Sequence, residues 1–334
     1  MRKRLLAGAG LWTCLALGLW GTPLAASPNA QTPTVRYHVV HGWPVLPEGR
    51  VLGSAAGVGV DSHGDVFVFH RAGRVWSEPL PLDLIQAPTI AVFNGKTGKL
   101  MKEWGAGLFA MPHGLTVDDH DNVWLTDVAL NQVFKFSPDG KLLMVVGERG
   151  VAGTDGRHFN RPTDIAVLPD GSFYVSDGYR NTRVAKFSPT GEFQFQWGRP
   201  GHGPGEFDVP HAIAVDARGR VYVADRENDR VQVFDNHGRF LAQWKSKTMG
   251  RPYAIALMKR GAVVVDGGEQ PKTGPDRSGA AVVDEDGRVL TTFGRYGNYD
   301  GQFQMAHDVA VDRQGDIFVV DIDGGRVQKF IPDR

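Results

Sequence analysis

Three histidines occupy the same position of a repeated motif, and together they have the composition of a metal site. They stand in the segments MPHGLTV, VPHAIAV and MAHDVAV, as His113, His211 and His307. A catalytic zinc site commonly has three protein ligands, often imidazoles, and keeps a fourth position open for water or substrate. A single histidine of this kind more often satisfies a hydrogen bond of the core. Three in equivalent positions favour a metal, and we therefore predict a zinc site here.

The motif belongs to a strand-turn-strand unit whose clearest copy is residues 111–136. In that copy, apolar stretches alternate with polar turns, so that strands are predicted at 114–117, 123–126 and 132–136. Period-two alternation bounded by Asp, Asn and Gly is typical of β-strands and not of helices. Related copies lie around Gly57, Arg161, Val209, Arg251 and Met305. Six copies at a spacing of roughly 50 residues predict the blades of a β-propeller.

Five of the six repeats end in a fourth predicted strand, and the copy that lacks one indicates how the ring closes. These strands follow a glycine turn and end at Trp104, Val146, Trp197, Trp244 and Phe293. The sixth copy stops at residues 330–332 without a fourth strand. The segment VRYHVVHGW, residues 35–43, has the composition to replace it. We therefore predict an all-β, six-bladed propeller over residues 36–334, in which the N-terminal strand completes the last blade and removes an open sheet edge.

The first residue of chemical interest in each blade lies at the start of the innermost strand, a position that we call the first slot. In chain order its occupants are Ala56, His113, Thr163, His211, Tyr253 and His307. Histidine is found in alternate blades only. Innermost strands line the central channel, and equivalent positions on alternate blades of six lie about 120° apart around the axis. The three imidazoles are therefore expected to converge on the axis as a tripod.

The second slot, which ends the second strand of each blade, holds mostly aspartate. Its occupants are His70, Asp127, Asp177, Asp225, Asp266 and Asp321. A carboxylate there is expected to accept N–H bonds from the following loop, as turn-forming aspartates do, so its role is structural. The residues that follow differ, and they include Arg71, Gly178–Tyr179 and Arg226–Glu227. Because these loops open on one rim of the channel, we expect them to face a substrate.

Charge and composition exclude some classes of partner. The 334 residues include 37 basic and 37 acidic side chains, so the chain has no excess of positive charge. Binding to nucleic acid relies on concentrated Lys and Arg, and we expect no nucleic-acid partner. The 43 glycines and 20 prolines suit an all-β repeat protein.

The N-terminus has the features of an export signal. Residues 2–4 are basic, residues 5–20 are largely apolar, and the small residues at 22–27 favour cleavage after Ala26. We therefore expect residues 1–26 to be a signal peptide, residues 27–35 to be a linker, and the mature protein to be periplasmic or secreted, without stable membrane contact. The one cysteine, Cys14, would be removed with the signal. A lipoprotein anchor at Cys14 and an uncleaved membrane anchor are the alternatives.

Several phrases are more distinctive than the general repeat. They are FHRAGRVW (69–76), TDVALNQVFKF (126–136), YVSDGYRN (174–181), VADREN (223–228) and MAHDVAV (305–311). In these phrases, and over nearly all of the chain after the signal, the sequence resembles the peptidyl-α-hydroxyglycine α-amidating lyases, whose propellers have NHL-like repeats. The resemblance implies an enzyme that cleaves the C–N bond of a peptidyl-α-hydroxyglycine, a carbinolamide, to an amide and glyoxylate.

The resemblance also implies roles for single residues. The zinc ligands of the family fall on His113, His211 and His307. A calcium site falls on Asp308 with the main-chain carbonyls of Val58 and Leu115. The active-site arginine, tyrosine and substrate-contacting methionine fall on Arg71, Tyr179 and Met305. This sequence departs from the family pattern in two places, because Arg180 stands where the animal enzymes have a cysteine and Ala306 stands where they have a proline.

These assignments predict a mechanism and leave two other functions open. Zinc would polarise a substrate oxygen, Arg71 would bind the terminal carboxylate, and Tyr179 would accept the hydroxyl proton. The substrate would be a peptide or small molecule with an α-hydroxyglycine-like end. The first alternative is a non-catalytic NHL-type binding propeller at the cell envelope. The second is a calcium-dependent propeller hydrolase such as a lactonase, which needs Glu, Asn and Asp on the axis, where this chain has histidines.

Overall fold

The computed structural model describes residues 35–269 and 276–333. The predicted signal peptide, residues 1–26, and nearly all of the predicted linker lie outside the described residues. Within these ranges the chain forms antiparallel sheets of four strands each and one short 3-10 helix, η1 (Arg226–Asn228). No helix in the described part is long and apolar enough to span a membrane.

The sheets are the blades of a propeller, and five of them are built from strands consecutive in sequence. Blade one contains β2 (Ala55–Val60), β3 (Asp65–His70), β4 (Ile90–Asn94) and β5 (Leu100–Trp104). Blade two contains β6 (Pro112–Val117), β7 (Val123–Asp127), β8 (Gln132–Phe136) and β9 (Leu142–Val146). Blade three contains β10 (Asp164–Val167), β11 (Phe173–Asp177), β12 (Arg183–Phe187) and β13 (Phe193–Trp197).

The remaining blades follow in the same order along the chain. Blade four contains β14 (Pro210–Val215), β15 (Val221–Asp225), β16 (Arg230–Phe234) and β17 (Phe240–Trp244). Blade five contains β18 (Pro252–Leu257), β19 (Ala262–Asp266), β20 (Gly279–Val283) and β21 (Val289–Phe293). Blade six contains β22 (Ala306–Val311), β23 (Ile317–Asp321), β24 (Arg326–Pro332) and β1 (Tyr37–Val39). The predicted all-β, six-bladed propeller is confirmed.

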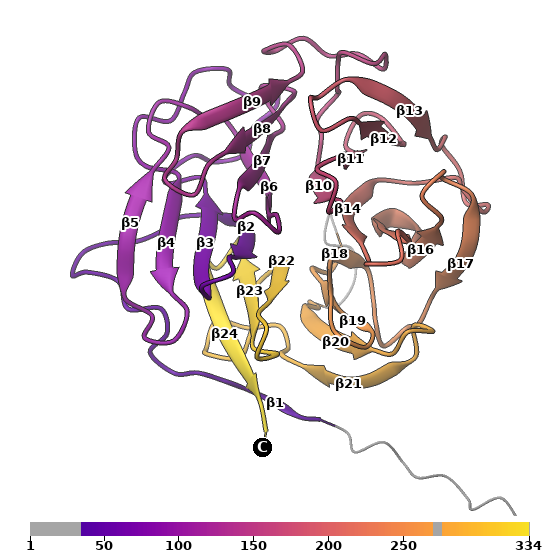
Figure 1. Cartoon of the computed structure of the whole chain (residues 1–334). Helices are drawn as coiled ribbons and strands as arrows, with labels where there is room; N and C mark the ends of the chain where they lie inside the picture. The colour runs from indigo at the N-terminus through magenta and orange to yellow at the C-terminus, as the bar shows by residue number, and fades with distance from the viewer. Residues whose placement is uncertain (1–34, 270–275, 334) are drawn as a thin grey trace, which may run out of the picture. The chain divides into compact units, whose positions relative to one another are not determined.

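The blades are arranged in a ring that is closed by the two ends of the propeller (Figure 1). The first strand of each blade contacts the first strand of the next, and β22 of blade six returns to contact β2 of blade one. Strand β1 pairs antiparallel with β24, with Tyr37 opposite Pro332 and Val39 opposite Phe330. The N-terminal strand therefore completes the last blade, as predicted. It is shorter than predicted, because the chain turns at Gly42 before Trp43.

The burial pattern explains why the second strand of each blade is the most apolar. The five residues of β7, β11, β15, β19 and β23 are all buried, because both sheet faces pack against neighbouring blades. The outermost strands are largely exposed but end in a large apolar residue. Trp104 packs on Phe136 of the next blade, with ring centroids 5.1 Å apart. Trp43 likewise packs on Phe318 at 5.1 Å and on Phe93 at 6.2 Å, and so joins blades six and one.

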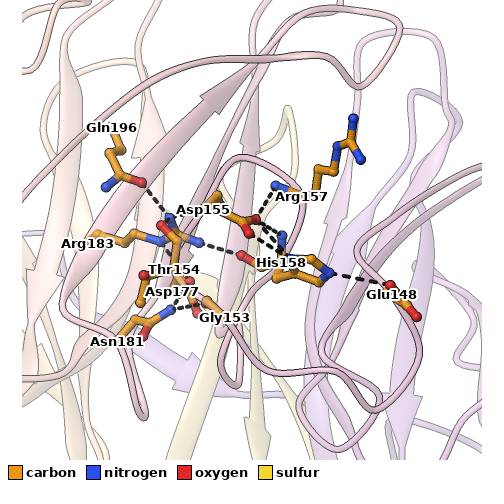
Figure 2. A network of polar contacts seen from close by, with 10 residues as sticks. All are labelled: Glu148, Gly153, Thr154, Asp155, Arg157, His158, Asp177, Asn181, Arg183 and Gln196. Atoms are coloured by element: carbon orange, nitrogen blue, oxygen red, sulfur yellow. Dashed lines mark hydrogen bonds and ion pairs between the residues drawn. The ribbon is translucent and has the colours of Figure 1, made fainter.

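The second-slot aspartate Asp127 accepts main-chain N–H bonds from the following loop, as predicted, and also from the preceding loop, which was not predicted. In blade three, Asp177 accepts hydrogen bonds from the main-chain N–H of Asn160 and from the side chains of Asn181 and Arg183 (Figure 2). Arg183 also donates to main-chain carbonyls, including that of His158 at 2.6 Å. The Asp177 side chain is fully buried and that of Arg183 is 5% exposed, so the pair is removed from water. Each of these buried charges is therefore compensated by the other.

Replacement of Arg183 by methionine tests this compensation. Methionine keeps much of the volume but leaves the Asp177 carboxylate buried without its cation. Breaking a buried pair in this way is expected to lower the free energy of unfolding by about 3–5 kcal/mol. The measurement is urea denaturation of the variant and the wild type. The control is Arg288→Met, because that side chain is 77% exposed and should change stability by about 0.5 kcal/mol or less. Equal stability of the two variants would contradict the proposed compensation.

Candidate metal and substrate site

The three repeated histidines meet on the axis of the ring. Each is the second residue of an innermost strand, His113 in β6, His211 in β14 and His307 in β22. Because these strands belong to alternate blades, the side chains approach from three directions, and one ring nitrogen of each lies within 4.8 Å of the others. The imidazole centroids are 4.8–5.0 Å apart. The structure therefore brings together the histidines that the sequence pattern selected.

Main-chain carbonyls of the other three blades orient the imidazoles. Nδ1 of each ring lies 2.6–2.8 Å from a carbonyl oxygen. These carbonyls belong to Thr163, Tyr253 and Ala56, which are the first-slot residues of the blades without histidine. Because a carbonyl oxygen can only accept, Nδ1 carries the hydrogen and Nε2 keeps an accepting lone pair. Bonds of this kind fix the tautomer and orientation of metal-binding histidines. The three Nε2 atoms are thus suited to one ion.

Burial keeps the imidazoles neutral. Their exposed fractions are only 1–4%. Burial, and then the charge of Arg71, lowers the pKa of His307 to about 3. The pKa of His113 is also lowered, by burial and then by His307 and Arg71. Burial and then Arg226 lower the pKa of His211. Neutral imidazole is the form that binds a metal, so the electrostatics and the geometry agree.

The hydroxyl of Tyr179 lies against two of the three imidazoles. It is 2.9 Å from Nε2 of His113 and 3.1 Å from Nε2 of His211. The phenol ring stands edge-on to both, with centroids 5.1 and 5.5 Å away. An atom held by the histidines would therefore be in direct reach of this hydroxyl. The structure joins the predicted tyrosine to the predicted metal site.

Two buried arginines flank the tripod, of which only one was assigned from the sequence. Arg71 is 5% exposed, and its Nε donates to the carbonyl of Pro112 at 3.0 Å. Arg226 is 8% exposed, and its guanidinium carbon lies 5.4 Å from the ring centre of Tyr179 and 4.9 Å from that of Tyr253. Burial lowers the pKa of Arg71 to about 10, so it stays charged at neutral pH. Arg226 also forms an ion pair with Glu227, with Nε 2.9 Å from Oε1, which compensates part of its charge. The remaining positive charge beside neutral imidazoles favours an anion.

The repeat itself explains how these side chains reach the channel. Arg71 and Arg226 directly follow the second-slot residues of blades one and four. The main-chain N–H of Arg71 donates to the carbonyl of Ser54 at 2.8 Å, and that of Arg226 donates to the carbonyl of Val209 at 3.1 Å. Each carbonyl lies two residues before the first slot of the same blade. Tyr179 makes the corresponding, longer bond of 3.5 Å in blade three. The repeated position after the second slot had marked Arg226 as a rim residue, but sequence reasoning assigned it no separate role.

Met305 lies beside this group. Its side chain is 9% exposed and packs in an apolar cluster that includes Ala56, Tyr253 and Ile322. Tyr253 in turn contacts His211 and His307, with ring centroids 5.1 and 6.0 Å apart. The methionine therefore lies in the layer of side chains around the tripod, and its contact with substrate stays a prediction.

The residues predicted to bind calcium line a cavity on the axis. Val58, Leu115 and Asp308 share this cavity of about 260 Å³ with Asp164, which the sequence reasoning missed. The Asp308 carboxylate accepts the N–H of Val58 at 2.9 Å, and that of Asp164 accepts the N–H of Ile213 at 3.0 Å. The same two carboxylates line a small void of about 10 Å³ with the three histidines. The two groups of candidate ligands are therefore neighbours.

Asp164 and Asp308 occupy equivalent places in opposite blades. Each directly follows a first-slot residue, in blades three and six, whereas small Gly or Ala residues follow the other four slots. Burial raises the pKa of Asp164 to about 7. Burial and then the charge of Asp164 raise the pKa of Asp308 well above its usual value. Burial therefore disfavours the two carboxylates as a pair of anions, and a cation between them would offset that cost. The pairing of acidic residues across the ring was the missed sequence signal.

The fold and these repeats place the chain in a broad class of propellers. The NHL repeat model matches residues 159–187, 207–234 and 303–330, which fall in blades three, four and six. A gluconolactonase of Xanthomonas campestris has a similar structure, with a TM-score of 0.59 and 14% sequence identity over 85% of this chain and 89% of that one. At this identity the likeness concerns the fold alone.

Three relatives are much closer in sequence. Peptidyl-alpha-hydroxyglycine alpha-amidating lyase 2 of Drosophila melanogaster is 34% identical over 91% of this chain and 77% of its own length. Lyase 1 of the same organism is 35% identical over 92% of this chain and 63% of its own length. Peptidyl-glycine alpha-amidating monooxygenase B of Xenopus laevis is 36% identical over 87% of this chain. The chain belongs to the peptidyl-α-hydroxyglycine α-amidating lyase family.

The chain matches only part of the first of these relatives. It spans 35% of the Xenopus protein and 63% of Drosophila lyase 1. The matched part is the propeller, because nearly all of the described chain is propeller.

Proposed function

We propose that the protein is a zinc-dependent lyase that cleaves the C–N bond of a peptidyl-α-hydroxyglycine to give an amide and glyoxylate. One observation carries the proposal. The Tyr179 hydroxyl contacts two of three converging imidazoles, and the guanidinium carbon of the buried Arg226 lies 5.4 Å from the centre of the Tyr179 ring. Family membership supports the same reaction.

The arrangement suits a substrate that has a carboxylate next to a hydroxyl-bearing carbon. Zinc held by Nε2 of His113, His211 and His307 would supply Lewis acidity, which polarises a substrate oxygen and eases loss of its proton. Arg71 presents a planar, permanently charged fork that binds a carboxylate through two parallel hydrogen bonds. Because its Nε is already bonded to a carbonyl, the two terminal nitrogens remain for the substrate.

Tyr179 is the group placed to move the proton. In the proposed reaction its oxygen takes the proton of the substrate hydroxyl as a general base, and the electron pair left on the substrate oxygen forms the second bond of the aldehyde carbonyl. The C–N bond breaks, its electron pair stays on nitrogen, and the nitrogen gains one proton to become the amide. The guanidinium carbon of Arg226 lies 5.4 Å from the centre of the Tyr179 ring, so a positive charge stands beside the proposed base. No redox partner is required.

A direct assay tests this function. The purified protein is offered N-benzoyl-α-hydroxyglycine and, separately, a small lactone, and its zinc content is determined. We expect about one zinc per chain, release of glyoxylate in step with benzamide, and no lactone hydrolysis. Lactone hydrolysis without glyoxylate would support the propeller hydrolase, and binding of zinc without either reaction would support a binding propeller.

We further propose that calcium binds on the axis to Asp308 and the main-chain carbonyls of Val58 and Leu115, with Asp164 as an additional carboxylate. The fit rests on two buried carboxylates in one cavity, whose charges need compensation. Calcium would supply that compensation and tie opposite blades together. The Asp308 carboxylate follows His307 directly, so order at one site supports order at the other.

Removal of the cation is expected to destabilise the propeller. A ligand at 100 times its Kd stabilises a protein by about 2.7 kcal/mol, which for a propeller of about 300 residues raises the melting temperature by roughly 4 °C. The measurement compares melting temperatures in calcium and in a chelator. Asp308→Asn should abolish the difference and Asp164→Asn should reduce it. As a matched control, the exposed Asp286→Asn should keep it. An undiminished calcium shift in Asp308→Asn would disprove the site.

The export signal predicted at residues 1–26 leads us to propose that the protein acts outside the cytoplasm, in the periplasm or after secretion. Its substrate there would be a peptide or small molecule with an α-hydroxyglycine-like end. Localisation of a tagged full-length protein by fractionation tests this proposal.

A further inference from the structure

Blade one has a long connection on the rim of the substrate site. Its second and third strands are joined by residues 71–89, whereas residues 128–131 make the same connection in blade two. We call residues 72–88 the strap. Near its end, Ile85 exchanges two main-chain hydrogen bonds, each of 2.8 Å, with Phe109 and Gly107. The strap is therefore attached to the segment that leads into blade two.

The middle of the strap is attached to blade three. Glu78 makes two parallel hydrogen bonds of 2.7 and 2.8 Å with the guanidinium of Arg161. Arg149, from the end of blade two, donates to the carbonyl of Leu82 at 2.9 Å. The strap thus extends from blade one over blade two to blade three. Its anchor on blade three, Arg161, accepts the main-chain N–H of Tyr179 through its own carbonyl, at 3.5 Å.

Trp76 is the strap residue that contacts the site. The guanidinium carbon of Arg71 lies 5.3 Å from the centre of its ring. The ring of Tyr179 stands against it with centroids 5.6 Å apart, at an interplanar angle of 61°. Arg161 also lies over the indole, at 5.9 Å. One half-buried side chain therefore contacts both the proposed carboxylate-binding residue and the proposed base.

We propose that Trp76 is a positioning residue that holds Arg71 and Tyr179 in their reactive places, and that the Glu78–Arg161 ion pair holds Trp76. The proposal rests on the proposed function. Arginine has many rotamers, and only its Nε is fixed by Pro112. An aromatic face against a desolvated guanidinium restricts the remaining freedom and excludes water from it. Tyr179 is restrained from the same side, since its hydroxyl must stay against the imidazoles.

The ion pair persists under working conditions. Hydrogen bonds from Arg161, with a further one from the indole of Trp76, lower the pKa of Glu78 to about 2. A carboxylate with a lowered pKa keeps its pair above its usual pKa and loses it only as the pH falls towards 2. The Glu78 side chain is 51% exposed, so its pair contributes little to overall stability. The main effect of the ion pair is expected to be on the position of Trp76.

Substitution of Trp76 tests the proposal through activity and a metal measurement. With N-benzoyl-α-hydroxyglycine, Trp76→Ala should lower kcat/KM by roughly 10–30-fold while zinc content stays that of the wild type. Trp76→Phe retains an aromatic face and should recover to within about threefold of the wild type. Unchanged kcat/KM in Trp76→Ala would overturn the proposal, as would loss of zinc.

A double-mutant cycle shows whether Trp76 acts through Arg71. In an Arg71→Ala background, Trp76→Ala should cost less than about threefold, because coupled residues are not additive. The full effect in that background would overturn the proposed coupling. Binding of glyoxylate, followed by calorimetry, needs no turnover and should weaken about tenfold in Trp76→Ala. If the wild-type protein shows no turnover but its glyoxylate binding still weakens in Trp76→Ala, the proposed function is disproved and the positioning role of Trp76 is not.

The ion pair has a matched control in the same chain. Arg161 and Arg180 both face Glu78, but Arg180 is 3.8 Å away and 56% exposed. Arg161→Met and Glu78→Gln should each lower kcat/KM by roughly three- to tenfold and should expose the strap to trypsin at Arg74. Arg180→Met should do neither. Equal behaviour of the two arginine variants would refute the role of the ion pair.

Discussion

His211→Ala is expected to lose bound zinc and to reduce turnover of an N-acyl-α-hydroxyglycine by about a thousandfold or more, since a Lewis-acid metal contributes several kcal/mol to catalysis. The reason is geometrical. Two imidazoles on one side of the axis leave the ion without its third ligand, and the Tyr179 hydroxyl, 3.1 Å from His211 Nε2, loses a partner as well. Metal analysis and steady-state kinetics measure both effects.

Controls separate the metal site from general unfolding. His211→Asn retains a side-chain N–H that can donate to the carbonyl of Tyr253, and should keep the melting temperature while losing zinc. The exposed His237→Ala should keep both zinc and turnover. Wild-type zinc content and turnover in His211→Ala would rule out the tripod as the active site.

Tyr179→Phe is expected to reduce kcat by about 10²–10⁴-fold, the usual contribution of a general base, and to leave zinc content unchanged. Phenylalanine keeps the ring that packs against Trp76 at 5.6 Å and removes only the hydroxyl at the imidazoles. Because Arg71 still binds the carboxylate, KM should change much less than kcat. A loss confined to KM would assign the tyrosine to binding instead.

A matched variant shows that the effect belongs to this hydroxyl. Tyr299→Phe removes the hydroxyl of a tyrosine that is 79% exposed and should have the kinetics of the wild type. If Tyr179→Phe and Tyr299→Phe have the same kcat, proton transfer must be carried out by another group.

Much of the site was predictable because the repeat shows which residues occupy equivalent positions in different blades. Once six copies are aligned, residues of equivalent position must lie at equivalent places around the axis, and the histidines of alternate blades must converge. The same comparison assigned the second-slot aspartates to loop binding. It also held the evidence for Asp164, which has the place in blade three that Asp308 has in blade six. That pairing is visible only when opposite blades are compared.

Other features depend on contacts between segments that the repeat does not relate. Trp76 belongs to a connection found in one blade, and Arg161 lies far from it in sequence, so no periodicity predicts the 2.7 Å bond between Arg161 and Glu78. Arg226 was recognisable as a rim residue, but its burial between two tyrosine rings follows from the packing of blades three, four and five.

The sequence by itself determined the all-β propeller, its closure by the N-terminal strand, and the three histidines, because each of these follows from local periodicity and repeat alignment. The tertiary structure alone decided how the three imidazole rings are oriented and which groups surround them. The carbonyls that fix Nδ1 belong to the neighbouring blades, and the burial that keeps the imidazoles neutral is a property of the closed ring. Such contacts arise between strands distant in sequence, and only the folded chain specifies them.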